Sequence, residues 1–164
     1  MMNTKKALTI ILTMALVLGV YGVAHAANEA TQSVSFEVQA INEISVSGNP
    51  EILTISAATP GSDPTPATDS STTYAITTNG TGKVITARID AAMPTGLTLT
   101  VNLEAPSVGD SADDVTLSTT AASVVTGIGP VAESSLTITY TLSATAEAEV
   151  GSGSRTVTFT LTDA

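Results

Sequence analysis

The strongest constraint on the fold is a period-two alternation of apolar and polar residues between Ser33 and Ser47. Six of its seven even positions are apolar, and Asn42 is the exception, while Ile41 alone interrupts the polar odd positions. Successive side chains of a strand point to opposite faces, so the pattern predicts a strand with one buried face. The apolar even positions are Val34, Phe36, Val38, Ala40, Ile44 and Val46.

The length of this alternation raises a choice. A strand of 15 residues would extend about 50 Å at about 3.3 Å per residue, whereas most strands have about five or six residues. One interpretation is that the strand bends near Asn42 and belongs to both sheets of its own domain. The other is that its first part, residues 27–40, extends beyond its own domain. Both interpretations remain open at this point.

The first residues have the features of an export signal. Two lysines precede an apolar run over residues 7–23, and Ala24-His25-Ala26 follows as a small-x-small cleavage site. We therefore predict a signal peptide over residues 1–26 and a secreted chain that has no membrane association after cleavage. The alternative is an uncleaved membrane anchor, for which a run of 17 residues is short.

The charge of the chain from Ala27 onward limits its partners. It contains fifteen acidic residues and three basic ones, Lys83, Arg88 and Arg155, which gives 3 − 15 = −12. So acidic a chain does not neutralise phosphate groups, which argues against nucleic acid and anionic lipid as partners. The sequence contains no cysteine, so no disulfide can form.

The rest of the chain repeats the alternation in short runs separated by turn residues. No segment shows a helical period, and threonine is the preferred residue on the polar face, where its β-branched side chain suits a solvated strand. We predict a single β-sandwich of jelly-roll or immunoglobulin-like type over residues 41–164, with about nine or ten strands. The clearest runs are Thr72–Thr78, Val84–Asp90, Leu97–Leu103, Leu136–Leu142 and Thr156–Thr162.

Several connecting segments give more local predictions. Asn79-Gly80 lies between two alternating runs and predicts a β-hairpin. The proline-containing segment Thr59–Thr73 predicts an exposed loop, and Ala105–Asp114 an acidic loop. Glu51–Ser56 predicts a short strand, and Ala144–Val150 is compatible with a strand or a short helix.

The sequence carries no catalytic signature. Nucleophilic and acid–base catalysis usually recruits His or Cys, and the single histidine, His25, lies within the predicted signal peptide. Carboxylate pairs could still serve a glycosidase, but the acidic residues fall mostly in loops and on polar faces. We therefore expect a protein that is not an enzyme.

Two weaker signals concern a metal ion and a glycan. Asp110, Asp113 and Asp114 could offer oxygen ligands to calcium, the one cofactor considered, but their spacing matches no known calcium-binding loop and a solvated acidic loop explains them. Asn79 begins an N-glycosylation sequon, but the predicted turn also accounts for it.

Edge protection also bears on function. Soluble sheet proteins commonly guard exposed edges with lysine, proline or inward charges, and lysine is nearly absent here. Unguarded edges fit a protein whose strands pair with a neighbouring molecule. The net negative charge opposes such assembly unless cations screen it.

The layout of the chain resembles a group of secreted filament subunits, the TasA-like biofilm-matrix proteins and the archaeal bundling pilins, with a functional parallel in chaperone–usher pilins. The resemblance rests on the signal cut at Ala24-His25-Ala26, the opening strand Ser33–Val38 and the cysteine-free run to the last residue. It implies that residues 27–40 are a donor strand that completes the sheet of the next subunit. The implied donor contacts are Val34, Phe36, Val38 and Ala40.

Two functions follow as hypotheses. The first is a structural subunit of an extracellular filament, pilus or biofilm matrix, in which copies of the chain join head to tail by donor-strand complementation. The alternative is a monomeric secreted or cell-surface β-sandwich that acts as an adhesion or carbohydrate-binding module. A sheet edge left open beside an undocked N-terminal segment favours the first, and a concave acidic or calcium-binding surface favours the second.

Overall fold

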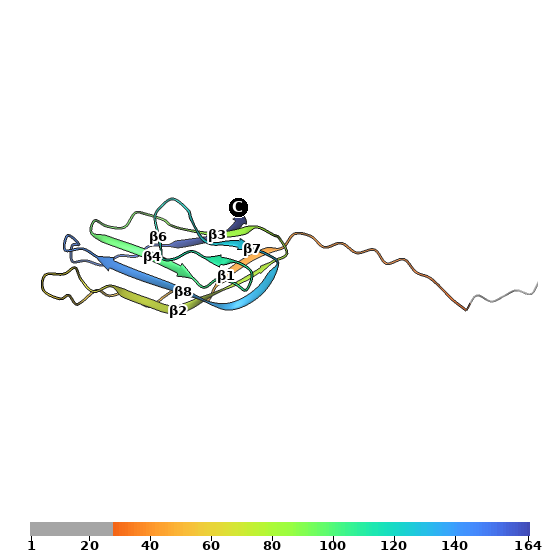
Figure 1. Ribbon diagram of the computed structural model, residues 1–164, viewed down its shortest axis with the longest axis horizontal. Helices are drawn as coiled ribbons and strands as arrows, with labels where there is room; N and C mark the ends of the chain where they lie inside the picture. The colour runs from red at the N-terminus through yellow and green to blue at the C-terminus, as the bar shows by residue number, and fades with distance from the viewer. Residues whose placement is uncertain (1–27) are drawn as a thin grey trace, which may run out of the picture. The chain divides into compact units, whose positions relative to one another are not determined.

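The computed structural model describes residues 28–164, and these residues form nine strands and no helix (Figure 1). The predicted signal peptide over residues 1–26 lies outside the described residues. Among those that are described, no helix is long and apolar enough to cross a membrane. The strands are β1 (Asn42–Val46), β2 (Ala67–Thr78), β3 (Lys83–Ile89), β4 (Leu97–Leu103), β5 (Asp110–Ser111), β6 (Val115–Thr116), β7 (Ala122–Ile128), β8 (Val131–Ala144) and β9 (Val157–Asp163).

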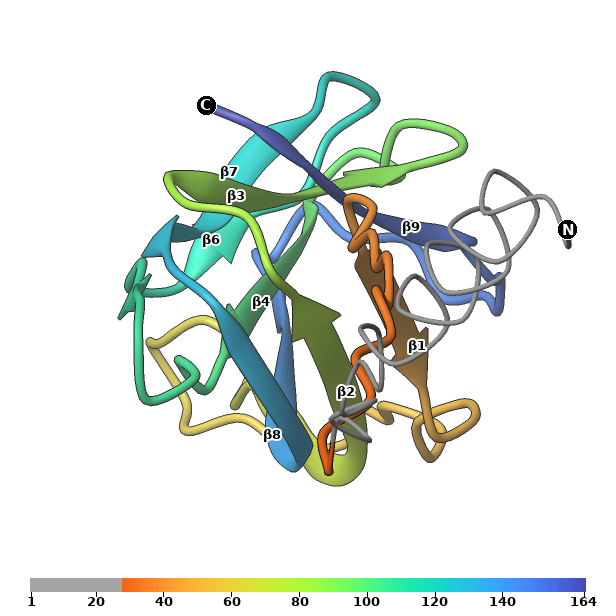
Figure 2. The same ribbon diagram turned by 90° about the vertical axis from the view of Figure 1, so that its right-hand side faces the viewer.

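All nine strands belong to one compact unit, Val38–Ala164, and form two antiparallel sheets. The five-stranded sheet has the order β1-β2-β8-β4-β6, and the four-stranded sheet has the order β5-β7-β3-β9. From β2 onward, each successive strand lies in the other sheet. Figure 2 shows the unit from one end, with β1 and β9 near each other as the outermost strands of their sheets.

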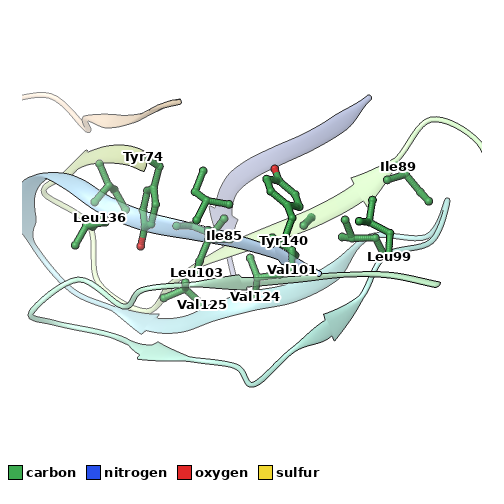
Figure 3. Close-up of a cluster of buried hydrophobic side chains, with 14 of the residues drawn as sticks. Tyr74, Ile85, Ile89, Leu99, Val101, Leu103, Val124, Val125, Leu136 and Tyr140 are labelled. Atoms are coloured by element: carbon green, nitrogen blue, oxygen red, sulfur yellow. The ribbon is translucent and has the colours of Figure 1, made fainter. Parts of the chain in front are cut away.

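Both sheets contribute to one hydrophobic core (Figure 3). Tyr74, Val101 and Ile138 come from the five-stranded sheet, and Ile85 and Val125 from the four-stranded sheet; all five are buried. Tyr74, Val101, Ile138 and Ile85 occupy apolar positions of the predicted alternating runs, so the inward faces of those runs are confirmed, whereas Val125 lies outside them. The prediction of an all-β fold is confirmed for the described residues.

The predicted hairpin at Asn79-Gly80 is wrong. The two strands that this turn joins, β2 and β3, lie in different sheets. Gly82 adopts a φ of 64°, a left-handed conformation that glycine tolerates without steric cost, and the chain crosses there from one sheet to the other. The period-two pattern shows which face of a strand is buried. It does not show whether the next strand pairs with it in the same sheet or packs against it from the opposite sheet.

Two other boundaries differ from the predictions. Of the strand predicted over Ser33–Ser47, only β1 forms, and Glu51–Ser56 forms no strand. The loop predicted over Thr59–Thr73 is too long, because β2 begins at Ala67. Serine and threonine suggested a loop there, but their hydroxyl groups bond across to β8: Thr68 with Thr141 at 3.3 Å and Ser70 with Thr139 at 3.0 Å.

Smaller differences concern the two segments that were hardest to assign. The acidic segment Ala105–Asp114 contains β5, a strand of two residues. Ala144–Val150 is neither a strand nor a helix beyond Ala144, the last residue of β8. Thr145 closes this connection by donating its N–H to the Gly96 carbonyl at 2.8 Å.

Candidate functional site

The N-terminal segment, residues 28–40, is the first part of the candidate site. It contains no strand, and every one of its residues is exposed. Val34 is 77%, Phe36 92% and Val38 78% exposed. Large apolar side chains repeated on one phase of an alternation, and left uncovered, are typical of an interaction surface.

Asn79 holds the end of this segment against the two-sheet unit. Its side-chain Oδ1 accepts a hydrogen bond from the Ile41 N–H at 2.9 Å, and its Nδ2 donates to the Gln39 carbonyl at 2.8 Å. The Asn79 N–H also donates to the Ile41 carbonyl at 3.3 Å. We call this group of three hydrogen bonds the Asn79 clasp. It fixes the backbone just before β1 begins.

The clasp changes the interpretation of Asn79, which the sequence offered as a glycosylation site. Nδ2 is the atom that would carry a glycan, and here it donates to the Gln39 carbonyl. Neighbouring Thr78 reinforces the same region, since its hydroxyl donates to Asn42 Oδ1 at 2.8 Å and accepts from the Gly80 N–H at 3.0 Å. These contacts give Asn79 a structural role that requires no glycan.

β1 is an edge strand of the five-stranded sheet. The Ile41 carbonyl accepts from Asn79, and the Ser47 N–H donates to the Thr73 carbonyl at 2.9 Å, so odd residues bond toward β2. In an antiparallel pair, the alternate residues turn their N–H and C=O groups to the other side. The even residues Asn42, Ile44 and Val46 therefore present their main-chain groups at the open edge.

β9 is the corresponding edge strand of the four-stranded sheet. The Asp90 N–H donates to the Thr156 carbonyl at 3.1 Å, which sets the even residues of β9 toward β3. By the same alternation, Val157, Phe159 and Leu161 turn their N–H and C=O groups to the open edge. The pairing of β9 with β3 runs over seven residues with no bulge, so this edge is regular along its whole length.

The side chains of these three β9 residues also face the core, but they are only half-buried. On β3, the next strand inward, Ile85, Ala87 and Ile89 are buried. Burial thus decreases from β3 to β9 across the sheet. The apolar layer between the sheets is incompletely covered at this side, where Ile44 of β1 is also half-buried.

The basic residues of the described chain gather near β9. Lys83 and Arg88 lie on β3, and Arg155 lies two residues before β9 begins. Lys83 Nζ forms an ion pair with Asp163 Oδ1 at 2.5 Å, at the end of β9, and the Arg155 guanidinium donates to the Ala92 carbonyl at 2.6 and 3.0 Å. The Arg88 side chain is exposed. The three basic residues of the described part therefore lie on β3 or next to β9, and Lys83 is paired with an acidic residue of β9.

The three aspartates proposed as a calcium site do not form a ligand cluster. Within residues 28–164, no group of three or more His, Cys, Asp or Glu side chains is placed to hold a metal ion. Asp110 lies on β5, and Asp113 and Asp114 follow in the exposed turn before β6. Their arrangement gives the calcium hypothesis no support.

A hollow with a volume of about 470 Å³ lies among the loops at Pro64, Gly96 and Thr145. Its one carboxylate, Asp63, accepts a hydrogen bond from the Ala146 N–H at 3.2 Å through Oδ1. That carboxylate is explained by its role in holding the loop. Serine, threonine, proline and alanine make up most of the remaining lining.

The shifted pKa values have structural causes. Burial, with the charges of Glu104 and Glu133, raises the pKa of Tyr74, whose hydroxyl donates to the Glu104 carbonyl at 2.5 Å. Burial raises the pKa of Tyr140 to about 12. Hydrogen bonding to Thr137, including its N–H at 2.8 Å, lowers the pKa of the Glu104 carboxyl group. None of these groups lines the large hollow described above.

The sequence predicted only part of this site. It identified Val34, Phe36, Val38 and Ala40 as the apolar phase of the N-terminal segment, and the structure leaves all four exposed. It missed the Asn79 clasp, for which the only signal was an asparagine with two competing explanations. Compared with known proteins, the chain matches no family model and no curated protein.

Proposed function

We propose that the protein is a secreted structural subunit of an extracellular filament, pilus or biofilm matrix. In this proposal the two sheets form a single β-sandwich of jelly-roll type, and the N-terminal segment of one copy completes a sheet of the next. The strand order supports the jelly-roll assignment, because β2-β8-β4-β6 lies over β3-β7-β5 with strands alternating between the sheets. The resemblance to donor-strand filament subunits points to the same function.

The observation that carries the proposal is the contrast within the N-terminal segment. Its sequence has the pattern of a half-buried strand, yet Val34, Phe36 and Val38 are exposed and no strand forms there. Such a segment binds by strand addition, in which main-chain hydrogen bonds give affinity and alternate side chains give the register. A head-to-tail contact of this kind does not close on itself, so it generates a fibre.

Burial of the apolar side chains of the segment would contribute favourable free energy to such a contact. Covering three apolar side chains at roughly 1.5–3 kcal/mol each gives a gross gain of about 5–9 kcal/mol. Ordering of the segment and mutual repulsion of subunits oppose this gain. Assembly should therefore be strengthened by salt or divalent cations, which screen the negative charge.

The second candidate function is a monomeric secreted or cell-surface module for adhesion or carbohydrate binding. The hollow near Pro64 and Thr145 is the surface that favours it, because its hydroxyl groups could bond to a sugar. This candidate predicts saturable binding of a glycan by particles that remain monomeric.

The decisive experiment is negative-stain microscopy of the chain from Ala27, beside a chain that lacks residues 27–40. The shortened chain retains all nine strands, so circular dichroism and thermal unfolding can establish that it folds. The proposal predicts filaments from the longer chain and discrete particles from the shorter one, across a series of salt and calcium concentrations. Discrete particles from both folded chains under all conditions would overturn it in favour of the monomeric module.

A further inference from the structure

We propose that β9 is the acceptor: the N-terminal segment of one copy pairs along the open edge of β9 of the next copy. This inference rests on the filament function proposed above and adds which edge strand receives the donor. The edge strands β5 and β6 have only two residues each, which leaves β1 and β9 as the candidates. β1 and β9 are both edge strands on the same side of the unit, so the choice between them needs independent observations.

The first observation is the match of apolar positions. The segment offers Val34, Phe36 and Val38 at every second residue, and β9 offers Val157, Phe159 and Leu161 at the same spacing. These β9 side chains are half-buried and their main-chain groups face the open edge. An added strand would continue the apolar layer and pair those groups. β1 is shorter, at five residues, and presents only Ile44 in a comparable half-buried position.

The second observation is charge. The N-terminal segment contains Glu29 and Glu37 and no basic residue. The basic residues nearest an open edge belong to the β9 side, where Arg88 lies beside Thr158 in the adjoining strand. β1 carries Glu43, which would repel an incoming acidic strand. Complementary charge steers encounter and disfavours the wrong surface.

The third observation identifies the occupant as another copy. Neither glycine nor proline, the two strongest turn-forming residues, occurs between Asn28 and Ser47. The Asn79 clasp holds the backbone of residues 39–41 on the side toward β2. Folding back onto the β9 edge of the same molecule would require a reversal within this held stretch. A neighbouring molecule meets no such restriction.

Disulfide trapping in this cysteine-free chain tests the proposal. The donor variants are Ser35→Cys and Glu37→Cys, on the polar phase of the segment. The acceptor variants are Thr158→Cys, Thr160→Cys and Thr162→Cys, at exposed positions on the outer face of β9. Matched controls on the outer face of β1 are Glu43→Cys and Ser45→Cys, which are also exposed. Since alternate acceptor positions are sampled, registers that differ by two residues are all tested.

Each donor variant is mixed with each acceptor variant at equal concentration, allowed to assemble and oxidised. We expect a dimer band on non-reducing gels for at least one β9 pair, at about fivefold the yield of any β1 pair, because a disulfide needs closely apposed Cβ atoms. Each variant oxidised alone gives the background, and microscopy of every mixture establishes whether filaments form.

The outcomes separate this proposal from the function on which it rests. Filaments with β1 cross-links, or with no cross-link at either edge, would overturn the assignment of β9 and leave the filament function standing. Discrete particles from the unmodified chain would remove the filament function itself. Filaments with β9 cross-links that a reducing agent reverses would establish both.

Discussion

Two stretches of the chain have nearly the same sequence pattern and opposite surroundings. Leu136, Ile138 and Tyr140 alternate with threonine and serine along β8, and they are 8%, 1% and 6% exposed. Val34, Phe36 and Val38 alternate with serine and glutamate, and their exposed fractions lie between 77% and 92%.

The difference between the two stretches lies in their partners. β8 lies between β2 and β4, and residues of the opposite sheet complete its covering. Alternation specifies which face of a strand is apolar, and it contains no information about which chain covers that face. The covered side chains of β8 stabilise the folded protein, whereas the uncovered side chains would stabilise a contact between copies in the proposed filament.

The largest expected effect on stability comes from comparing substitutions of a covered and an uncovered apolar side chain. Ile138→Ala should reduce the free energy of unfolding by about 2–5 kcal/mol, because it removes a buried side chain and leaves a cavity. Phe36→Ala should change the unfolding free energy of the unassembled subunit by less than about 0.5 kcal/mol, as surface substitutions usually do. Urea denaturation of dilute, unassembled protein measures both values. A loss of several kcal/mol for Phe36→Ala would mean that the segment packs within its own molecule.

The comparison also explains how far the sequence could predict the fold. The inward faces of β3, β4, β8 and β9 were predictable because each is a short alternating run, and the bounds of β4, Leu97–Leu103, agree with the prediction. The sheet to which each strand belongs was not predictable, since the core-facing residues are the same for either sheet. The error at Asn79-Gly80 has this origin, because a turn that favours a hairpin also suits a crossing between sheets.

The candidate site shows the same limit. Residues 33–40 could be identified as an unusual strand from their pattern and length alone. The half-buried state of Phe159 and Leu161 depends on the strand order, because only the outermost strand of a sheet lacks a neighbour. In the Asn79 clasp, Asn79 bonds to Ile41, 38 positions earlier in the sequence, and to Gln39, 40 positions earlier. A local sequence pattern cannot predict hydrogen bonds between residues so far apart.

Ionisation of Tyr140 provides a second test of the burial of the β8 side chains. Burial raises its pKa to about 12, above the ordinary value of about 10 for an exposed tyrosine. The unfolded chain therefore releases this proton at lower pH than the folded protein, so stability should be retained below pH 10 and should fall as the pH rises toward 12. The slope contributed by one such group is at most about 1.4 kcal/mol per pH unit.

The measurement is urea denaturation at several pH values between 8 and 11.5, compared with Tyr140→Phe. The variant should show a shallower decrease, and subtracting the two profiles isolates the contribution of the Tyr140 hydroxyl. Parallel profiles for the two proteins would mean that the Tyr140 hydroxyl is as exposed to water as the side chains of the N-terminal segment.

The Asn79 clasp lies at the boundary between the uncovered and covered regions, and breaking it should have a smaller effect. Asn79→Ala removes the side-chain bonds to Ile41 and Gln39, which are exposed, and should cost about 1 kcal/mol or less. Amide hydrogen exchange at Ile41 should become several-fold faster, while exchange at Ile138 stays unchanged. If Ile41 already exchanges as fast as Phe36 in the unmodified protein, the clasp does not hold the boundary.

The smallest predicted effect has the opposite sign. Thr72 occupies an inward position of β2 and is buried, and its hydroxyl oxygen has no hydrogen-bond partner among the described residues. Burying an unpaired hydroxyl is unfavourable, whereas a valine of nearly the same shape carries no such penalty. Thr72→Val should therefore stabilise the subunit by about 0.5–1 kcal/mol.

Thr78→Val is the matched control, because Thr78 is equally buried on the same strand but its hydroxyl bonds to both Asn42 and Gly80. This change should destabilise the subunit by about 1–3 kcal/mol, since it leaves two polar groups without their partner. Opposite signs for two Thr→Val changes on β2 would show that hydrogen bonding decides how much a buried threonine costs in stability. In the N-terminal segment, Ser35→Val should leave the stability of the unassembled protein unchanged, because Ser35 is exposed.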